Sequence, residues 1–194
     1  MSGADAPAPP PAYLGMGVGG FIDALSATTP DPGGGSVAAL AVTLAAGLCM
    51  MTAGLSRRQL PTAGQLAGQA RLLRDRAAPL AQADAEAYRA VLAAMRAPGG
   101  PGEALSRACA TPMEVAEIGA EVAALAAAIA TGGNPNVRGD AITAALLAAA
   151  GSRAAAALVR INLAGAPGDV RPARAEQLAA EAADLAAAAV AAPR

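Results

Sequence analysis

The sequence predicts an all-α fold, a compact bundle of about five to six helices rich in Ala and Leu. Ala and Leu are strong helix formers and dominate the chain, whereas aromatic residues (two Tyr, one Phe and no Trp) and β-branched residues are scarce. Helices with Ala faces pack closely, which favours a compact bundle. At 194 residues the chain suits one domain. We therefore expect a disordered Pro/Ala-rich tail at 1–15 and a single helical domain at 16–194.

The first two predicted helices flank a turn rich in Pro and Gly. A short helix around Phe21–Leu25 should end before Pro30, and a second should run from about Ser36 to Leu55, with Ser36 as its N-cap. The second segment has no charged residue and is apolar around its whole circumference, as in the central helix of a bundle or a membrane span. Its residues are mostly Ala, Gly, Thr and Met, so we favour a buried helix of a soluble bundle, with a membrane helix as the alternative.

The later part of the chain predicts four more helices, at about Thr62–Met95, Glu103–Thr131, Asn134–Leu163 and 173–192. Pro79 should kink the first of these, because proline has no N–H to donate to the preceding turn. Thr111-Pro112 should likewise kink or break the second. Asn134 offers an N-cap for the third helix, followed by a proline at its first position.

The residue types that are missing limit the possible chemistry. The chain has no His and no Lys, so it cannot build a Ser–His or Cys–His nucleophile, a lysine Schiff base or a P-loop. Cys49 and Cys109 stand far apart and predict buried thiols in a reducing compartment rather than a zinc site. We see no signal peptide and expect a cytoplasmic protein without a metal. The net charge of −1 argues against nucleic-acid binding.

The stretch 30–36, Pro-Asp-Pro-Gly-Gly-Gly-Ser, precedes the uncharged helix. Gly33, Gly34 and Gly35 have no Cβ, so a ligand could approach the backbone closely and meet the free N–H groups and positive end of the helix. The same composition also suits a tight turn that only leads into a buried helix. The motif alone leaves both interpretations open.

Asp84 and Asp140 are the acidic candidates. Asp84 is the one acid in a stripe of apolar residues at helical spacing, formed by Leu73, Ala77, Leu80, Tyr88, Val91 and Met95. Burial would raise the pKa of its carboxyl group and suit it to general acid or proton-shuttle chemistry, whereas pairing with an Arg of a neighbouring helix would make it structural. Asp140 either complements the dipole of its helix or accepts two N–H bonds from a planar amidine-like edge.

Five arginines are candidates for binding anionic groups. Arg57 and Arg58 form a solvated loop pair, or an anion clamp if they border the glycine turn. Arg138, Arg153 and Arg160 would suit anionic ligand groups or pair with acids within the bundle.

Three blocks in this order resemble the formimidoyltetrahydrofolate cyclodeaminase / methenyltetrahydrofolate cyclohydrolase family. They are Pro30–Ala41, Asp84–Tyr88, and a third made of Gly133–Asn136, Asp140-Ala141 and Val159–Leu163. The resemblance covers residues 16 to 190 and implies an all-α homodimer acting on one-carbon tetrahydrofolate derivatives. It would hydrolyse 5,10-methenyltetrahydrofolate to 10-formyltetrahydrofolate, or release ammonia from 5-formimidoyltetrahydrofolate. No tightly bound cofactor, metal, nucleic acid or membrane is expected.

The resemblance also implies roles for individual residues. Asp84 would be the proton shuttle, and Asp140 the partner of the amino-pyrimidinone edge of the pterin. The turn Gly33–Ser36 would hold the folate at the helix N-terminus. The remaining expected substrate-binding residues are Asn136, Asn162 and, for the glutamate carboxylate of the folate, Arg57, Arg58 or Arg160.

Two positions depart from the family pattern. Gly139 stands where the family often has Ser, and Leu158 where it commonly has Asn. These departures motivate a second hypothesis, a non-catalytic folate-binding or structural helical bundle derived from the family.

Overall fold

The computed structural model describes residues 12–192, and in this part of the chain every regular element is helical. The all-α prediction is confirmed, and each predicted helical segment is present. The elements are η1 (Tyr13–Gly15), α1 (Val18–Ser26), α2 (Gly34–Gly54), α3 (Ala63–Ala77), α4 (Leu80–Met95), α5 (Gly102–Ala108), α6 (Ala110–Gly132), η2 (Pro135–Val137), α7 (Arg138–Asn162) and α8 (Arg171–Ala191).

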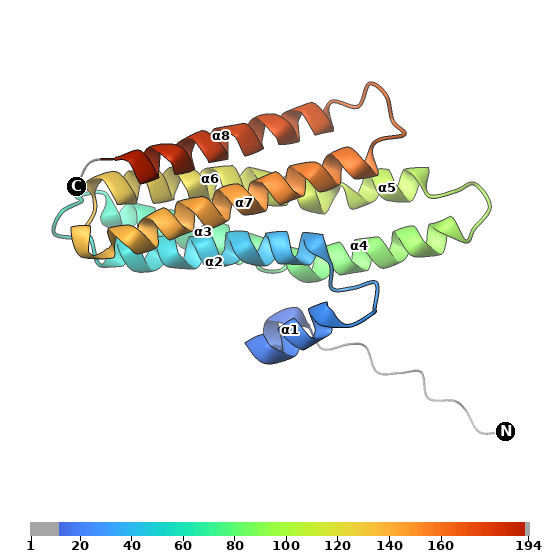
Figure 1. Cartoon of the computed structure of the whole chain (residues 1–194), viewed down its shortest axis with the longest axis horizontal. Helices are drawn as coiled ribbons and strands as arrows, with labels where there is room; N and C mark the ends of the chain where they lie inside the picture. Colours follow the sequence, from blue (N-terminus) through green and yellow to red (C-terminus); the bar gives the residue numbers. More distant parts are fainter. Residues whose placement is uncertain (1–11, 193–194) are drawn as a thin grey trace.

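The long helices run side by side, and α7 packs against α2, α6 and α8 (Figure 1). Helix α1 lies apart from the main bundle, below α2 in this view. The core consists mostly of Ala side chains, and its largest fully buried members are Ile118 and Ile129. Small side chains let the helix axes approach closely, as the composition predicts.

Two of the predicted helices are divided where the sequence places proline. α3 ends at Ala77 and α4 begins at Leu80, so the kink expected at Pro79 is present. α5 and α6 are divided at Cys109, because Pro112 has no N–H to donate to the carbonyl of Ala108. Beyond these breaks α4 and α5 pack against each other in a small apolar cluster of their own, built around Val91, Ala104 and Ala108.

The expected N-cap role of Ser36 is wrong. α2 begins at Gly34, its N-cap is Gly33 without a side-chain hydrogen bond, and Ser36 is a fully buried residue inside the first turn. Its hydroxyl donates to the carbonyl of Ala81 in α4 at 2.7 Å, and this contact draws Ser36 into the bundle. Asn134 does cap, since its side chain accepts the N–H of Asn136 at 3.0 Å, but the capped element is η2 rather than α7.

The N-terminal boundary also differs from the expected one. Residues 1–11 of the expected tail lie outside the described residues. Tyr13 lies in the turn η1 and is only 7% exposed. The rings of Tyr13 and Phe21 pack edge to face with their centroids 5.6 Å apart, and the backbone N–H of Tyr13 donates to the side-chain oxygen of Gln82 at 3.4 Å. Packing therefore begins at Tyr13, before the boundary drawn at residue 16.

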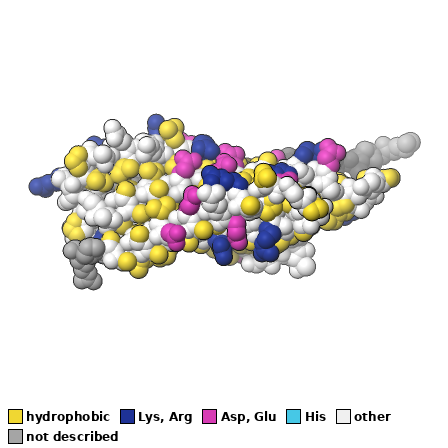
Figure 2. All heavy atoms as spheres, turned by 90° about the horizontal axis from the view of Figure 1, so that it is seen from above, with side chains coloured by type: hydrophobic (Ala, Val, Ile, Leu, Met, Phe, Trp, Pro, Cys, Tyr) yellow, Lys and Arg dark blue, Asp and Glu magenta, His cyan; other side chains and the backbone are white. Residues whose placement is uncertain are grey.

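The surface carries its charges unevenly. Figure 2, seen from above Figure 1, shows Arg and acidic side chains gathered over the middle of that face. Three helical stretches, Gly34–Gly54, Gly102–Gly132 and Pro135–Asn162, are long and apolar enough to cross a membrane by length and composition. In the structure they pack against one another, and acids of α6 pair with Arg76 of α3 on the outside.

A close approach of α2 and α7 makes Gly151 sensitive to substitution. A Cβ at this position would lie 2.6 Å from Cγ2 of Val42 and 3.0 Å from the carbonyl oxygen of Ala38. We expect Gly151→Ala to lower the free energy of unfolding by about 1–3 kcal/mol, because overpacking outweighs the gain in helix propensity. Urea denaturation measures this change.

The matched control is Gly68→Ala in α3, where an added Cβ meets nothing within 4 Å. It should be neutral or stabilising, by up to about 1 kcal/mol. Equal stability of Gly151→Ala and the wild type would contradict the close packing of α2 on α7.

Candidate functional site

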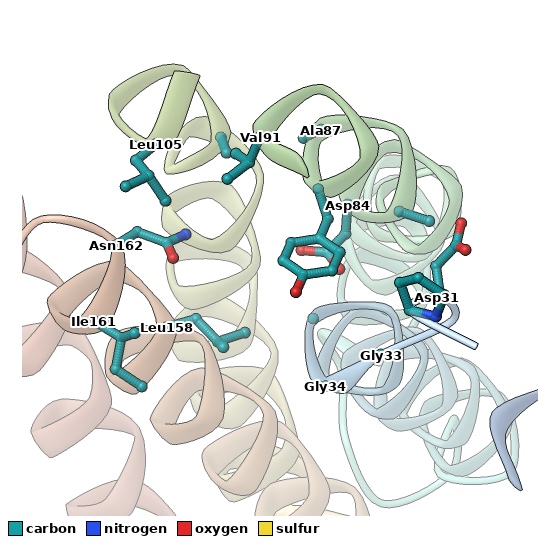
Figure 3. Close-up of a pocket in the computed structure, with 15 residues that line it drawn as sticks. Asp31, Gly33, Gly34, Asp84, Ala87, Val91, Leu105, Leu158, Ile161 and Asn162 are labelled. Atoms are coloured by element: carbon teal, nitrogen blue, oxygen red, sulfur yellow. The ribbon is translucent and has the colours of Figure 1, made fainter. Parts of the chain in front are cut away.

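A pocket of about 330 Å³ lies where the first turn of α2 meets α4, α5 and the last turns of α7. Figure 3 shows residues of α2 and α4 facing those of α7 across it. Its walls are mostly apolar and include Val91, Leu105 and Leu158. The polar side chains among its lining residues are those of Asp31, Asp84, Tyr88 and Asn162.

A hollow of about 540 Å³ lies at the opposite end of the bundle, between the end of α6 and the start of α7. Among the described residues that line it, none is acidic. Arg138, the one charged residue in the described part of this lining, donates to the backbone carbonyls of Ala130 and Ala189 at 3.3 and 3.4 Å. The smaller pocket, which contains Asp84, therefore has more side chains that could take part in a reaction.

Asp84 lies directly against the first turn of α2. A Cβ built on Gly35 would be 2.0 Å from Oδ1 and 2.3 Å from Cγ of Asp84, so only glycine leaves room for the carboxyl group in this position. Figure 3 shows Asp84 extending from α4 toward the start of α2. The glycine turn is thus required for close approach, here by a side chain of the protein itself.

The backbone N–H of Ser36 completes this contact by donating to the Asp84 carboxylate. The first N–H groups of an α-helix have no partner within the helix, and Asp84 satisfies one of them. Because the Ser36 hydroxyl donates to Ala81 in α4, the same residue also joins the two helices that carry the contact.

Asp84 has a raised pKa. Burial raises it from the usual carboxyl value, and the hydrogen bond from the Ser36 N–H opposes the change. Within residues 12–192 no arginine forms an ion pair with it, so the structural alternative of a buried Asp–Arg pair is not observed. A half-buried carboxyl group without a countercharge can hold a proton at a higher pH than an ordinary aspartate, which suits proton transfer.

The raised pKa also affects stability. The folded chain binds the Asp84 proton more tightly than the unfolded chain, so this group favours folding below the ordinary carboxyl pKa and loses that contribution as pH rises through the raised value. Asp84→Asn removes the buried charge. It should therefore raise the free energy of unfolding more at about pH 7 than at about pH 4.

Urea denaturation of wild type and variant at the two pH values tests this prediction. Asp23→Asn is the control, because Asp23 is exposed on α1. An equal effect of Asp84→Asn at both pH values would contradict a raised pKa.

The rim of the pocket is held by an ion pair between Asp31 and Arg89. Arg89 lies on α4, one and a half turns after Asp84, and Asp31 belongs to the turn that precedes α2. Tyr13 lies beside this pair, and burial is the main cause that raises the pKa of its phenol. The pair fixes the turn to the same helix that carries Asp84.

The opposite wall is the end of α7. Asn162 lines the pocket and forms a hydrogen bond with the thiol of Cys109. Burial raises the pKa of this thiol, and the charge of Arg171 and the bond with Asn162 oppose the change. Arg171 in turn donates to the carbonyl of Ser106 at 2.8 Å, which ties α8 to α5.

The structure brings together only part of the predicted site. Gly33, Gly34, Gly35, Asp84 and Asn162 all line the pocket. Ser36 lies behind them and acts through its N–H. Arg160 is exposed on the last turns of α7, next to pocket residues but not among them.

Four predicted binding residues lie at the other end of the bundle: Arg57, Arg58, Asn136 and Asp140. The 21 residues of α2 separate the two ends by about 30 Å. Asn134 links the segments that carry these four residues, because its backbone N–H donates to the Ser56 hydroxyl at 2.9 Å and its side chain donates to the carbonyl of Leu55 at 3.1 Å. Within one chain the two arginines do not border the glycine turn, so the condition for an anion clamp at that turn is not met.

Some pocket residues were not singled out from the sequence as site residues. Tyr88 lines the pocket and is 43% exposed, although the sequence places it in the apolar stripe. Its position one turn after Asp84 is the signal that could have indicated this. Leu105 and Ile161 have no comparable signal, since only the packing of α5 and α7 brings them to the pocket.

Comparison with known proteins identifies the family. The family model described as "Formiminotransferase-cyclodeaminase" matches residues 17–184. The chain belongs to this family. The resemblance seen in the three sequence blocks is thereby confirmed.

Two proteins are similar to this chain of the formiminotransferase-cyclodeaminase family. A methenyltetrahydrofolate cyclohydrolase of Methylorubrum extorquens is 33% identical over 162 residues, which cover 75% of this chain and 78% of that protein. The crystal structure of formiminotetrahydrofolate cyclodeaminase from Thermotoga maritima matches with a TM-score of 0.82 and 24% identity, covering 91% of this chain and 94% of the other. The second comparison confirms the fold.

Proposed function

We propose that the chain is a methenyltetrahydrofolate cyclohydrolase, which hydrolyses 5,10-methenyltetrahydrofolate to 10-formyltetrahydrofolate. The observation that carries the proposal is the Asp84 carboxyl group, which lies against Gly35 and the Ser36 N–H in a mostly apolar pocket and has no ion-pair partner among residues 12–192. The similarity to the Methylorubrum cyclohydrolase supports the choice of substrate.

In the proposed reaction Asp84 moves one proton twice. Its carboxylate takes a proton from water as the water oxygen bonds to the amidinium carbon, which neutralises the substrate cation and forms a tetrahedral carbinolamine. The protonated Asp84 then gives the proton to N5 as the carbon–N5 bond breaks. The hydroxyl proton of the new formyl group leaves to solvent, so one proton is released per turnover. A carboxyl pKa nearer to neutrality suits both transfers.

The Ser36 N–H keeps the carboxylate oriented toward the pocket during this cycle. The hydrogen bond from the Ser36 N–H stabilises the charged form of Asp84, whereas the apolar walls destabilise that form. Because the two effects oppose each other, Asp84 can both take up and release a proton. Asn162, on the facing wall, is placed to bind the substrate by its amide.

The related cyclodeaminase reaction is the second candidate, because the matching family model is described by that activity. There N10 attacks the formimino carbon of 5-formimidoyltetrahydrofolate and ammonia leaves, which makes the enzyme a lyase. Asp84 would take the proton from N10 and deliver it to the departing nitrogen. The same pocket residues serve both reactions.

We further propose that the enzyme is a cytoplasmic homodimer with no tightly bound cofactor, no nucleic-acid partner and no membrane attachment. The near-neutral net charge supports the absence of a nucleic-acid partner. Ion pairs on the outside of the apolar helices, such as Arg76 with Glu114, support the absence of membrane attachment.

The deciding experiment offers the two substrates separately to the purified protein. Loss of the near-ultraviolet absorbance of methenyltetrahydrofolate, faster than in buffer, is the expected result. Ammonia release from formimidoyltetrahydrofolate alone would instead identify the cyclodeaminase. Binding of methenyltetrahydrofolate without acceleration of either reaction would refute both and favour the non-catalytic folate-binding protein.

A further inference from the structure

The chain has three aromatic residues, two Tyr and one Phe, and two of the three pack against each other. Tyr13 is buried, and its ring lies edge to face on that of Phe21. The third, Tyr88, lies on α4, is 43% exposed and lines the Asp84 pocket. An exposed aromatic ring gains the stabilisation of apolar burial only when something covers it. Because Tyr88 lines a pocket, a bound ligand is the group that would cover it.

The wall of the pocket that α7 forms presents aliphatic side chains. Ile161 lines the pocket and is 63% exposed, and Leu158 lies three residues before it on the same face of the helix. Figure 3 shows these two residues across the pocket from Asp84 of α4. An aromatic ring on one wall and branched aliphatic side chains on the other form a slot suited to a flat group. The volume of about 330 Å³ is at the small end of the range for ligand pockets, so the pocket suits the reacting centre of a folate with one flanking ring.

In the described part of the chain, no positively charged side chain lines this pocket. The two charged side chains that line it are both acidic, and Asp31 is already paired with Arg89. The charge of Asp84 changes with the proton that it carries. The face of the Tyr88 ring, in contrast, is permanently negative, because the π electrons form a quadrupole with a negative face and a positive edge. The pocket therefore offers a flat cation a permanent attraction, and none of these lining residues repels it.

Tyr88 follows Asp84 by one helical turn, which places the two Cβ atoms about 5–6 Å apart on one face of α4. A substrate whose reacting carbon meets the Asp84 carboxyl group therefore places the neighbouring group on the Tyr88 ring. In 5,10-methenyltetrahydrofolate this group is flat and charged, because one positive charge is shared by N5, the bridging carbon and N10 in conjugation with the aminobenzoyl ring. The addition of water to the bridging carbon removes both the charge and the conjugation.

We propose that Tyr88 is a specificity-determining residue, whose ring stacks on the delocalised cation of methenyltetrahydrofolate and distinguishes this charged substrate from neutral folates. The inference rests on the proposed function and adds to it a residue that selects the charge state of the substrate. The attraction between a cation and an aromatic face is stronger where water is excluded, as between the apolar walls of this pocket. Once hydrolysis neutralises the ligand, the ring no longer attracts it in this way, which favours release of the product.

Two variants separate the π face of Tyr88 from its size and its hydroxyl group. Tyr88→Phe keeps the ring and removes the hydroxyl, whereas Tyr88→Leu keeps an apolar side chain without a π face. Both should fold, because the side chain is exposed on its helix and leucine is a strong helix former. Circular dichroism and urea denaturation verify this. Ile161→Ala is the comparison on the facing wall, since it removes apolar contact without removing a ring.

Binding is measured by calorimetric titration in the Asp84→Asn background, so that methenyltetrahydrofolate is not consumed, and in mildly acidic buffer, where this cation persists. The neutral comparison ligand is 5-formyltetrahydrofolate, whose reacting centre carries no charge. Tyr88→Leu should weaken binding of the cation about tenfold and binding of the neutral folate by no more than about threefold. Tyr88→Phe should keep the preference for the cation, and Ile161→Ala should weaken binding of both ligands by a similar factor.

Several results of this titration would overturn the inference. Equal losses for the two ligands in Tyr88→Leu would mean that the ring only fills space, and an unchanged affinity for the cation would mean that the ring does not touch it. A Tyr88→Phe variant as impaired as Tyr88→Leu would assign the effect to the hydroxyl. An Ile161→Ala variant that loses the preference for the cation to the same extent as Tyr88→Leu would assign that preference to the shape of the slot.

Steady-state kinetics with Asp84 intact gives a second readout. Tyr88→Leu should raise KM about tenfold and change the turnover number by less than about threefold, because the ring binds the charged substrate and carries no proton. This pattern is the opposite of the one expected for Asp84→Asn. A loss of turnover number at unchanged KM would contradict the binding role of Tyr88.

The failure of this inference and the failure of the proposed function give different results. Absence of turnover, together with a preference for the cation that depends on Tyr88, would refute the proposed function and leave the inference standing. Turnover, together with equal losses for the two ligands in Tyr88→Leu, would refute the inference alone. If the Asp84→Asn protein binds neither folate, both fail.

Discussion

Replacing Asp84 with asparagine should lower the turnover number by about 10²- to 10⁴-fold, the contribution expected of a residue that transfers protons in the transition state. Asparagine keeps the size of the side chain, and its oxygen can still accept the Ser36 N–H, so the fold and the pocket persist. It cannot take up or release a proton. Steady-state kinetics with methenyltetrahydrofolate measures the loss, and substrate affinity should change little.

The control for this experiment is Glu86→Gln. Glu86 lies two residues later on the same helix, but it is exposed and accepts a hydrogen bond from Gln82 at 3.2 Å. It should retain the wild-type rate. Retention of turnover by Asp84→Asn would show that another group carries the proton and would remove the central element of the proposed mechanism.

Gly35→Ala should reduce turnover about 100-fold without touching an ionisable group, because a displacement of about 1 Å at a reacting group can cost that much. The new Cβ would fall 2.0 Å from Oδ1 of Asp84, so the carboxyl group must rotate away and give up the Ser36 N–H. The helix itself tolerates alanine. Kinetics together with circular dichroism should show a folded protein with a displaced acid.

Gly34→Ala gives the comparison for Gly35→Ala. Gly34 precedes Gly35 in the same turn, yet an added Cβ there meets nothing within 4 Å. Its effect on turnover should be much smaller. Equal losses in the two variants would indicate that the glycines act through backbone conformation rather than through the space they leave for Asp84.

The fold was predictable from the sequence because its signals are local. Alanine and leucine content indicates helices, and the effect of Pro79 and Pro112 on the preceding turn depends only on residues four positions away. Helix starts were harder to predict. Three glycines in a row can join a helix or precede it, and the hydroxyl of Ser36 turned to α4 because Ala81 lies within reach in the folded chain.

The site was predictable where one helix carries the signal. Asp84 stands out as an acid in an apolar stripe, and this needs only the helical period. Its contact with Gly35 joins residues 49 positions apart in the chain and required the packing of α2 on α4. Likewise, order along the chain cannot tell which family blocks share an end of the bundle. The length of α2 separates Asp140 from Asp84.

The alanine core has a consequence for how this protein can respond to a ligand. Alanine has no side-chain rotamers, so the interior around Ala39, Ala81 and Ala123 cannot adjust by changing χ angles. Room for a bound folate must come from small sliding or tilting of whole helices, the shear type of motion. The breaks at Pro79 and Cys109 separate α4 and α5 from the long helices α3 and α6, so a shift of α4 would carry Asp84 with it.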